Sequence, residues 1–103
     1  MGYREELIKK QNYFAYALGE LLEFAKYRGY LLTFPKEHIN HMEGSLHFEG
    51  LAKDINLYTK DFVYLTDTED YRELGEFWEL LGGAWGGRFN DGCHFSFEHN
   101  GKK

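Results

Sequence analysis

The stretch SLHFEGLAKDINLY, residues 45–58, contains both a strand pattern and the polar residues that indicate the chemistry of the chain. In its second half every other residue is polar, beginning at Asp54, while Ile55 and Leu57 are apolar. Successive side chains of a β-strand point to opposite faces, so this alternation separates a polar face from an apolar one. We therefore predict a strand whose polar face carries function.

Two further β-prone runs flank this stretch. FVYLT at residues 62–66 is reached through the short segment 59–61, which suits a hairpin, so the two strands should pair antiparallel. Upstream, YLLTF at residues 30–34 is closed by Pro35, which cannot donate a hydrogen bond to a continuing ladder. The polar residues 36–44 show neither a strand nor a helix period, and we predict a loop near the site.

Two segments show the three-and-four spacing of apolar residues that lines one face of a helix. The first runs from Glu5 to about Arg28 and should end at Gly29. Its apolar positions are Leu7, Phe14, Leu18, Leu21 and Ala25. The second should begin at a capping box formed by Thr66 and Glu69. Its apolar positions are Tyr71, Leu74, Trp78 and Leu81, followed by Gly82 and Gly83.

The C-terminal stretch GAWGGRFNDGCHFSFEHNGKK, residues 83–103, begins with a glycine-rich turn. An alternating strand follows, with His94, Ser96 and Glu98 on one face. We expect the final residues NGKK, 100–103, to fray, because short polar ends of a chain usually lack tertiary partners.

Composition excludes several classes of protein. With 103 residues, 43% of them hydrophobic and 18% aromatic, the chain fits one globular domain spanning residues 1–103. The net charge of −5, without a cluster of Lys or Arg, argues against nucleic acid as a partner. The N-terminus MGYREELIKKQ has no apolar signal segment and the apolar runs are short, so we expect a protein made in the cytoplasm without membrane insertion. We also expect a monomer. A single cysteine, Cys93, excludes an internal disulfide framework.

Several residues form a candidate catalytic metal site. Zinc in such sites takes three ligands from His, Asp, Glu or Cys and keeps a fourth position open. His47 lies before a turn that Gly50 permits, and Asp54 follows on the strand, so the turn can bring both side chains toward one point. In the turn-forming sequence NDGCH, Gly92 lets Asp91 and His94 converge from a tight turn.

These residues stand in two motifs that resemble a known family. SLHFEGLAKD, residues 45–54, matches the SxHxxGxAxD motif of the M15 metallopeptidases, and LGGAWGGRFNDGCHFSFEH, residues 81–99, resembles the carboxyl end of phage-encoded members. The resemblance covers roughly residues 30–100. It implies zinc as cofactor, held by His47, Asp54 and His94, with Asp91 as the catalytic base.

The resemblance also implies a fold and a substrate. The fold would be α+β of the M15 and hedgehog-like type, with a small antiparallel sheet, a long N-terminal helix, a second helix and the zinc site at the sheet. The activity would be hydrolysis of peptidoglycan stem peptides beside D-amino acids, as a D,D-carboxypeptidase or an L-Ala-D-Glu endopeptidase. The protein would act on the bacterial cell wall and be encoded by a phage or prophage, like an endolysin.

One departure from the family keeps an alternative open. Relatives usually carry an arginine between the first strand and the SxH motif, where it holds the substrate near the metal. Residues 33–44 contain no arginine, and Lys36, the only full cation there, lacks the bidentate fork that suits a carboxylate. The alternative is a catalytically silent zinc-containing protein that binds wall peptide or a phage structural partner. A structural zinc domain would need a fourth ligand, which the sequence does not offer.

The remaining residues of interest have structural interpretations. Ser45 should support the loop that presents His47 rather than act as a nucleophile, because no paired base accompanies it. Cys93 adjoins His94, so in a strand its side chain would point to the opposite face, and we expect a packed residue rather than a ligand. We expect solvent exposure for His38, His41 and His99, and core positions for Trp78 and Trp85.

Overall fold

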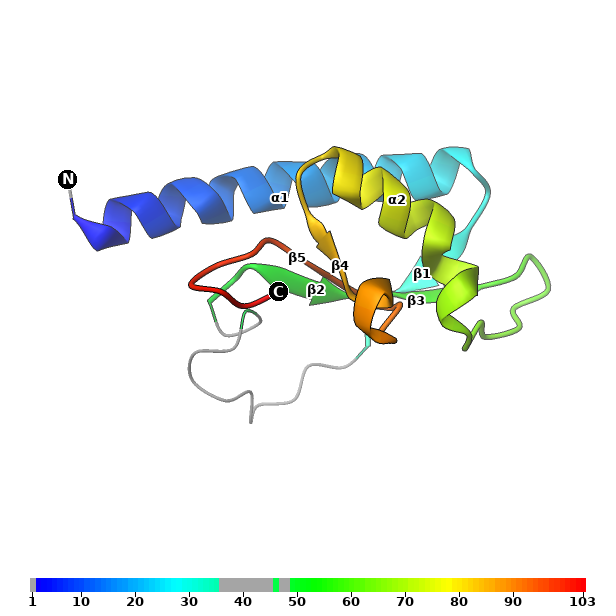
Figure 1. Ribbon diagram of the computed structural model, residues 1–103. Helices are drawn as coiled ribbons and strands as arrows, with labels where there is room; N and C mark the ends of the chain where they lie inside the picture. The colour runs from blue at the N-terminus through cyan, green and yellow to red at the C-terminus, as the bar shows by residue number, and fades with distance from the viewer. Residues whose placement is uncertain (1, 36–45, 47–48) are drawn as a thin grey trace.

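The computed structural model describes residues 2–35, 46 and 49–103 (Figure 1). A long helix, α1 (Tyr3–Tyr27), occupies one side of the molecule, where the sequence predicts a helix. Its buried residues are Phe14, Ala17, Leu21 and Ala25. The helix ends as predicted at Gly29, whose φ is +84°, and the Tyr30 N–H turns back to the Ala25 carbonyl at 3.0 Å.

The strands form two small antiparallel sheets. The first pairs β1 (Leu31–Thr33) with β3 (Asn56–Tyr58). The second has the order β2-β5-β4 and contains β2 (Ala52–Asp54), β4 (Ala84–Trp85) and β5 (His94–Ser96). A second helix, α2 (Arg72–Leu80), follows the short 3₁₀ helix η1 (Thr68–Tyr71), and a further one, η2 (Gly86–Phe89), follows β4. The α+β class predicted from the sequence is confirmed.

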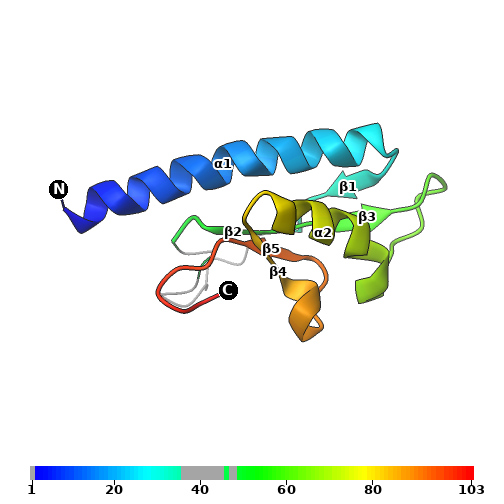
Figure 2. The same cartoon turned by 45° about the horizontal axis from the view of Figure 1, so that its top comes forward.

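Both α-helices lie over the same side of the strands (Figure 2). They contact each other through Phe24 and Phe77, whose rings stack with centroids 4.2 Å apart. Trp78 projects from α2 into the core, where it lies against Phe97 and Phe14 at centroid distances of 5.1 and 5.6 Å. Aromatic packing therefore joins the two helices to Phe97, which directly follows the strand that carries His94.

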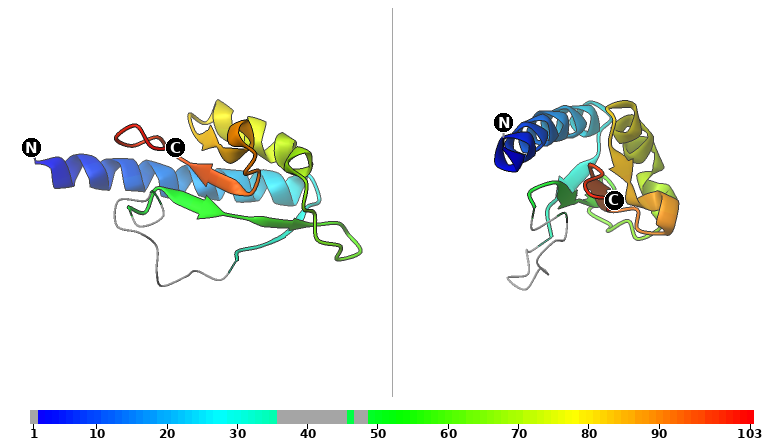
Figure 3. Two further views of the ribbon diagram at one scale, coloured as in Figure 1. Left: turned by 60° about the horizontal axis from the view of Figure 1, so that its bottom comes forward. Right: turned by 60° about the vertical axis from the view of Figure 1, so that its left-hand side comes forward.

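The predicted strand through residues 52–58 is divided between the two sheets at Ile55. Figure 3 shows β2 and β3 running almost end to end. Ile55 is fully buried, and its N–H donates to the Cys93 carbonyl at 2.9 Å. Leu57 is also fully buried, whereas Asp54 is only half-buried, so the predicted alternation of faces is confirmed.

Two local predictions are wrong in part. Residues 62–66 return antiparallel beside β3, as predicted, but they pair through a single bridge between Tyr58 and Tyr64 and do not form a regular strand. The second helical segment begins one residue later than predicted. Its N-cap is Asp67, whose N–H donates to the Asp70 carboxylate at 3.2 Å. The capping box is therefore formed by Asp67 and Asp70 rather than by Thr66 and Glu69.

No helix among the described residues is long and apolar enough to cross a bilayer.

Candidate metal centre

Two of the predicted ligands lie directly opposite each other in the three-stranded sheet. In the antiparallel pairing of β2 with β5, Asp54 is the register partner of His94. Their side chains meet on one face, with 3.3 Å between Asp54 Oδ1 and His94 Nδ1. The strands thus bring together two residues that are 40 positions apart in the chain.

The second nitrogen of His94 also faces an oxygen. His94 Nε2 lies 2.8 Å from the main-chain oxygen of Lys103. Burial lowers the pKa of the imidazole, but the hydrogen bonds to Asp54 and Lys103 and the charges of Asp54 and Asp91 outweigh burial and raise it above the ordinary value. An oxygen acceptor at each nitrogen stabilises the imidazolium when no metal is bound.

The pair has the chemistry and spacing of zinc ligands. Zinc bonds of about 2.1 Å in tetrahedral geometry place two ligand atoms roughly 3.4 Å apart, close to the 3.3 Å between Asp54 Oδ1 and His94 Nδ1. Histidines that bind metal usually donate their other ring N–H to a carboxylate or a main-chain carbonyl. The contact between His94 Nε2 and Lys103 is of that kind.

A tight turn presents Asp91 and His94. The His94 N–H donates to the Asp91 carbonyl at 3.1 Å, and the Asp91 N–H donates to Gly86 at 2.9 Å. Gly92 packs so closely on η1 that a Cβ there would come within 2.8 Å of Thr68 Cα, so only glycine fits. The turn therefore has its place fixed by backbone contacts on both sides.

The indole of Trp85 holds the same turn from within. Its Nε1–H donates to the Gly92 carbonyl at 2.8 Å, and the side chain is almost fully buried. The guanidinium groups of Arg72 and Arg88 lie 5.6 and 5.3 Å from the ring centroid. Sequence reasoning placed Trp85 in the core but missed its bond to the turn, for which the sequence gives no local signal.

Cys93 is a protonated thiol beside the predicted base. Its Sγ–H donates to Asp91 Oδ1 at 3.4 Å. Burial, together with the negative charges of Asp91 and Asp54, raises the pKa of Cys93 to about 12. The half-buried Cys93 side chain packs against the hydrophobic core, as predicted.

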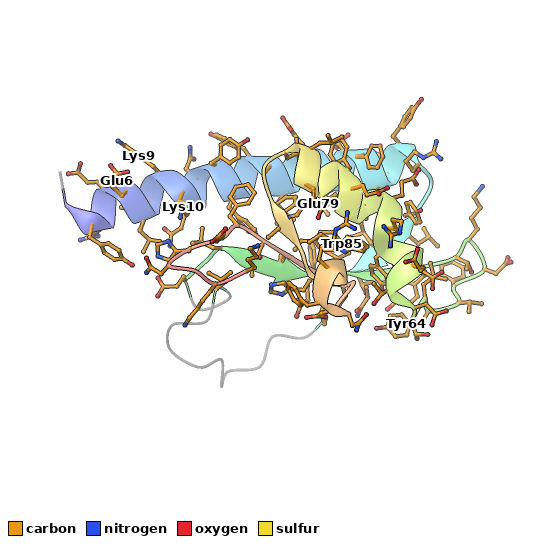
Figure 4. All side chains as sticks on the ribbon, in the orientation of Figure 1. Glu6, Lys9, Lys10, Tyr64, Glu79 and Trp85 are labelled. Atoms are coloured by element: carbon orange, nitrogen blue, oxygen red, sulfur yellow. The ribbon has the colours of Figure 1, made fainter. Side chains whose placement is uncertain are left out.

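Two cavities adjoin these residues. One of 120 Å³ is lined by residues that include Asp91, Cys93 and Tyr64, and Figure 4 labels the last of these. The other, of 410 Å³, is lined by residues that include Phe89 and Lys103, which also contact His94: the Phe89 ring lies 6.2 Å from the His94 ring. The smaller cavity therefore adjoins the predicted base, and the larger one adjoins residues that contact the predicted ligand His94.

The charged wall of the larger cavity is an ion pair. Arg88 Nε and the terminal nitrogen Nη2 donate to the Glu79 carboxylate at 2.9 and 2.7 Å. Glu79 and Trp85 come from α2 and β4 (Figure 4). This bond holds η2 against α2, and the pKa of Glu79 is lowered by its hydrogen bond to Arg88.

Two predicted site residues, His47 and Ser45, lie outside the described residues. The same holds for His38 and His41, which were expected to face solvent. Within residues 2–35, 46 and 49–103, no group of three or more His, Cys, Asp or Glu side chains is arranged to hold a metal ion. The turn before Asp54 is described at its base, where the Leu51 N–H donates to the Leu46 carbonyl at 2.8 Å.

The prediction that His99 faces solvent is wrong. Its ring is half-buried between the end of the chain and α1, with Lys10 Nζ 3.1 Å from Nδ1 and the Tyr3 hydroxyl 3.1 Å from Nε2. Both partners, Lys10 and Tyr3, come from the first part of α1. Periodicity in the sequence could not indicate that this part of the helix lies beside His99.

The chain matches a known protein family over much of its length. Residues 40–97 match the M15 peptidase family model described as D-alanyl-D-alanine carboxypeptidase. The match covers more than half of the chain and includes Asp54, the turn with Asp91, and His94. Helix α1 and strand β1 lie before it. No curated protein matches the chain.

Proposed function

The chain belongs to the M15 peptidase family described as D-alanyl-D-alanine carboxypeptidase, and from this premise we propose a zinc-dependent peptidase of bacterial cell walls. One observation carries the zinc part of the proposal: the 3.3 Å approach of Asp54 Oδ1 to His94 Nδ1 across β2 and β5. Both residues lie in the matched segment, and their spacing suits two ligands of one tetrahedral ion.

The proposed site assigns a task to each residue. Asp54 Oδ1 and His94 Nδ1 hold the metal together with His47, which the SxH motif supplies. Zinc bound there would supply Lewis acidity, which polarises a peptide carbonyl and acidifies water. The Asp91 carboxylate takes a proton from the attacking water and returns it to the leaving amine. Trp85 keeps the turn that carries Asp91 in place through its bond to the Gly92 carbonyl.

The proposed substrate is a peptidoglycan stem peptide cut beside a D-amino acid. The family description supports a D,D-carboxypeptidase, and the resemblance of residues 81–99 to phage-encoded members supports an L-Ala-D-Glu endopeptidase. Both reactions hydrolyse a short peptide and need the same metal, base and open cleft. We propose action on the wall itself, with a phage or prophage as the source of the gene.

Two measurements on one set of proteins test this function. Elemental analysis should find about one zinc per chain in the wild type and none in Asp54→Ala, since three-ligand sites rarely survive the loss of a ligand. Mass spectrometry of digested peptidoglycan should show new muropeptides with the wild type only. Asp61→Ala, which removes an exposed carboxylate, is the matched control and should behave as the wild type.

The two measurements separate the possible failures. A wild type that binds zinc but releases nothing from walls of several chemotypes would be the catalytically silent binding protein. A metal-free wild type, with no zinc taken up from solution, would contradict the metal site itself.

A further inference from the structure

Residues 98–103 form a hairpin, so the prediction that residues 100–103 fray is wrong. The N–H groups of His99 and Lys102 each donate to the other residue's carbonyl, at 2.9 and 3.0 Å. The two residues between them, Asn100 and Gly101, have φ of 51° and 79°. Positive φ at both central positions is the signature of a type I′ turn, and Asn-Gly is its preferred sequence. We refer to residues 98–103 as the C-terminal hairpin.

The hairpin brings the main-chain oxygen of Lys103 back to strand β5. That oxygen accepts a hydrogen bond from Ser96 Oγ at 2.5 Å and lies 2.8 Å from His94 Nε2. Ser96 is fully buried, and its hydrogen bond to Lys103 fixes the position of its hydroxyl. One oxygen is thus shared by a buried hydroxyl and by the imidazole opposite Asp54.

Helix α1 fixes the other side of the hairpin. Lys10 Nζ donates to the Glu98 carbonyl at 3.0 Å and lies 3.1 Å from His99 Nδ1. The Tyr3 hydroxyl lies 3.1 Å from His99 Nε2. Figure 4 shows Lys10 on the side of α1 that faces the end of the chain. Contacts from α1 and β5 therefore hold the hairpin at both of its ends.

We propose that the C-terminal hairpin positions His94 for metal binding, with Ser96 and the Lys103 oxygen as its positioning groups. The inference rests on the proposed function only for the identity of the ion. A hydrogen bond from Nε2 to the Lys103 oxygen leaves Nδ1 as the nitrogen that faces Asp54. Without that acceptor the imidazole could rotate about its χ angles, and every alternative orientation would cost metal affinity.

The matched segment ends at residue 97, so the hairpin lies just beyond it. Of the two positioning residues, Ser96 lies inside the family match and Lys103 lies outside it. Helix α1, which holds the hairpin through Lys10, also lies outside the match. The parts of the chain before and after the match thus cooperate to orient one residue within it.

Two substitutions remove the positioning contacts in different ways. Ser96→Ala deletes the hydroxyl without adding volume, and Gly101→Val places a β-branched residue at φ +79°, a conformation that such residues strongly avoid. A Cβ at Gly101 would meet no atom within 4 Å, so the effect is confined to the backbone of the turn. Gly29→Val is the matched control, because Gly29 has φ +84° but lies at the far end of α1.

The first readout is zinc affinity, measured by competition with a chelator of known affinity. Ser96→Ala and Gly101→Val should each weaken zinc binding by roughly 10–100-fold, the usual effect of removing a group that orients a ligand. Gly29→Val should lose thermal stability through the same backbone strain while keeping the wild-type zinc affinity. This separates positioning of the ligand from general loss of stability.

The second readout is the ring N–H of His94 in the NMR spectrum of metal-free protein. The wild type should show an Nε2–H resonance protected from exchange by the Lys103 oxygen, and Ser96→Ala and Gly101→Val should lose that protection. An unchanged resonance together with unchanged zinc affinity in both variants would overturn the proposal. If the wild type binds no zinc, the proposed metal function fails, and the resonance alone still decides whether the hairpin orients His94.

Discussion

The two sheets of this protein differ in how tightly side chains pack around them. In the sheet β2-β5-β4 the indole N–H groups of Trp78 and Trp85 donate to main-chain oxygens of Ser96 and Gly92 at 2.9 and 2.8 Å. In the turn that adjoins the sheet β1-β3, by contrast, the large side chains of Phe62, Val63 and Tyr64 are exposed, although Leu57 of β3 is fully buried. The tightly packed sheet is the one that carries predicted site residues, Asp54 and His94, whose side-chain atoms lie 3.3 Å apart. No predicted site residue comes from the sheet β1-β3.

Asp91→Asn should have the largest effect on the site-bearing region. An amide keeps the shape of the side chain but cannot accept a proton from water at neutral pH, so hydrolysis of wall peptides should fall by roughly 10²–10⁴-fold. Zinc content should stay as in the wild type. Asp61→Asn makes the same chemical change in the turn that follows β3 and should leave the rate unchanged.

The measurement is muropeptide release on one peptidoglycan preparation, with metal content determined in parallel. Equal rates for Asp91→Asn and the wild type would make Asp91 a turn residue only. Glu98 would then be the next carboxylate to substitute.

Gly75→Ala should have the second-largest effect, on stability. A Cβ at Gly75 would lie 2.1 Å from the Trp85 ring, which itself holds the site turn. Overpacking of this kind costs about 3 kcal/mol, which denaturant unfolding would detect as a lower midpoint. Gly19→Ala is the matched change in α1, where nothing lies within 4 Å of the new Cβ. It should stabilise the protein by about 0.5–1 kcal/mol because alanine favours helix.

A similar loss of stability in both glycine variants would remove the contrast between the packed site region and the rest. A tolerated Gly75→Ala would show that the Trp85 ring can move without disturbing the fold. The near-UV circular dichroism of the tryptophans would then report that movement directly.

The helices were predictable from the sequence because periodicity is local. Apolar spacing alone placed α1, and the residues Leu21 and Ala25 that it predicts for the core are fully buried. The pairing of Asp54 with His94 was not available from the pattern, since a contact across 40 residues depends on the order of the strands. Resemblance to a family supplied that pair of residues, and the register of β2 with β5 gives it a geometry.

The C-terminal hairpin shows how one local signal can hide another. The polar ending NGKK indicated fraying, although Asn-Gly is also the strongest short signal for a type I′ turn. The deciding contacts come from Ser96 and Lys10, which lie outside the segment. No reading of residues 100–103 alone could have identified these partners.

The smallest predicted effect belongs to the exposed turn after β3. Among the described residues other than glycine, positive φ occurs at Asn90, Asn100 and Phe62, and asparagine tolerates this conformation far better than phenylalanine. Phe62 has φ +67° and is 79% exposed, so little burial compensates for the strain. The turn is held instead by Thr59, whose carbonyl accepts the Phe62 N–H at 2.9 Å.

Phe62→Asn should therefore stabilise the protein by about 0.5–1 kcal/mol, because the strain is relieved while the hydrogen bond to Thr59 is kept. For a domain of this size that gain raises the melting temperature by roughly 2–8 °C. Val63→Asn is the matched control: Val63 is also exposed but is not among the residues with positive φ, so it should gain nothing. Zinc affinity and hydrolysis should be the same in both variants, since the turn carries no predicted site residue. A loss of stability in Phe62→Asn would mean that the ring makes a stabilising contact in solution, and the turn would then belong with the packed region rather than apart from it.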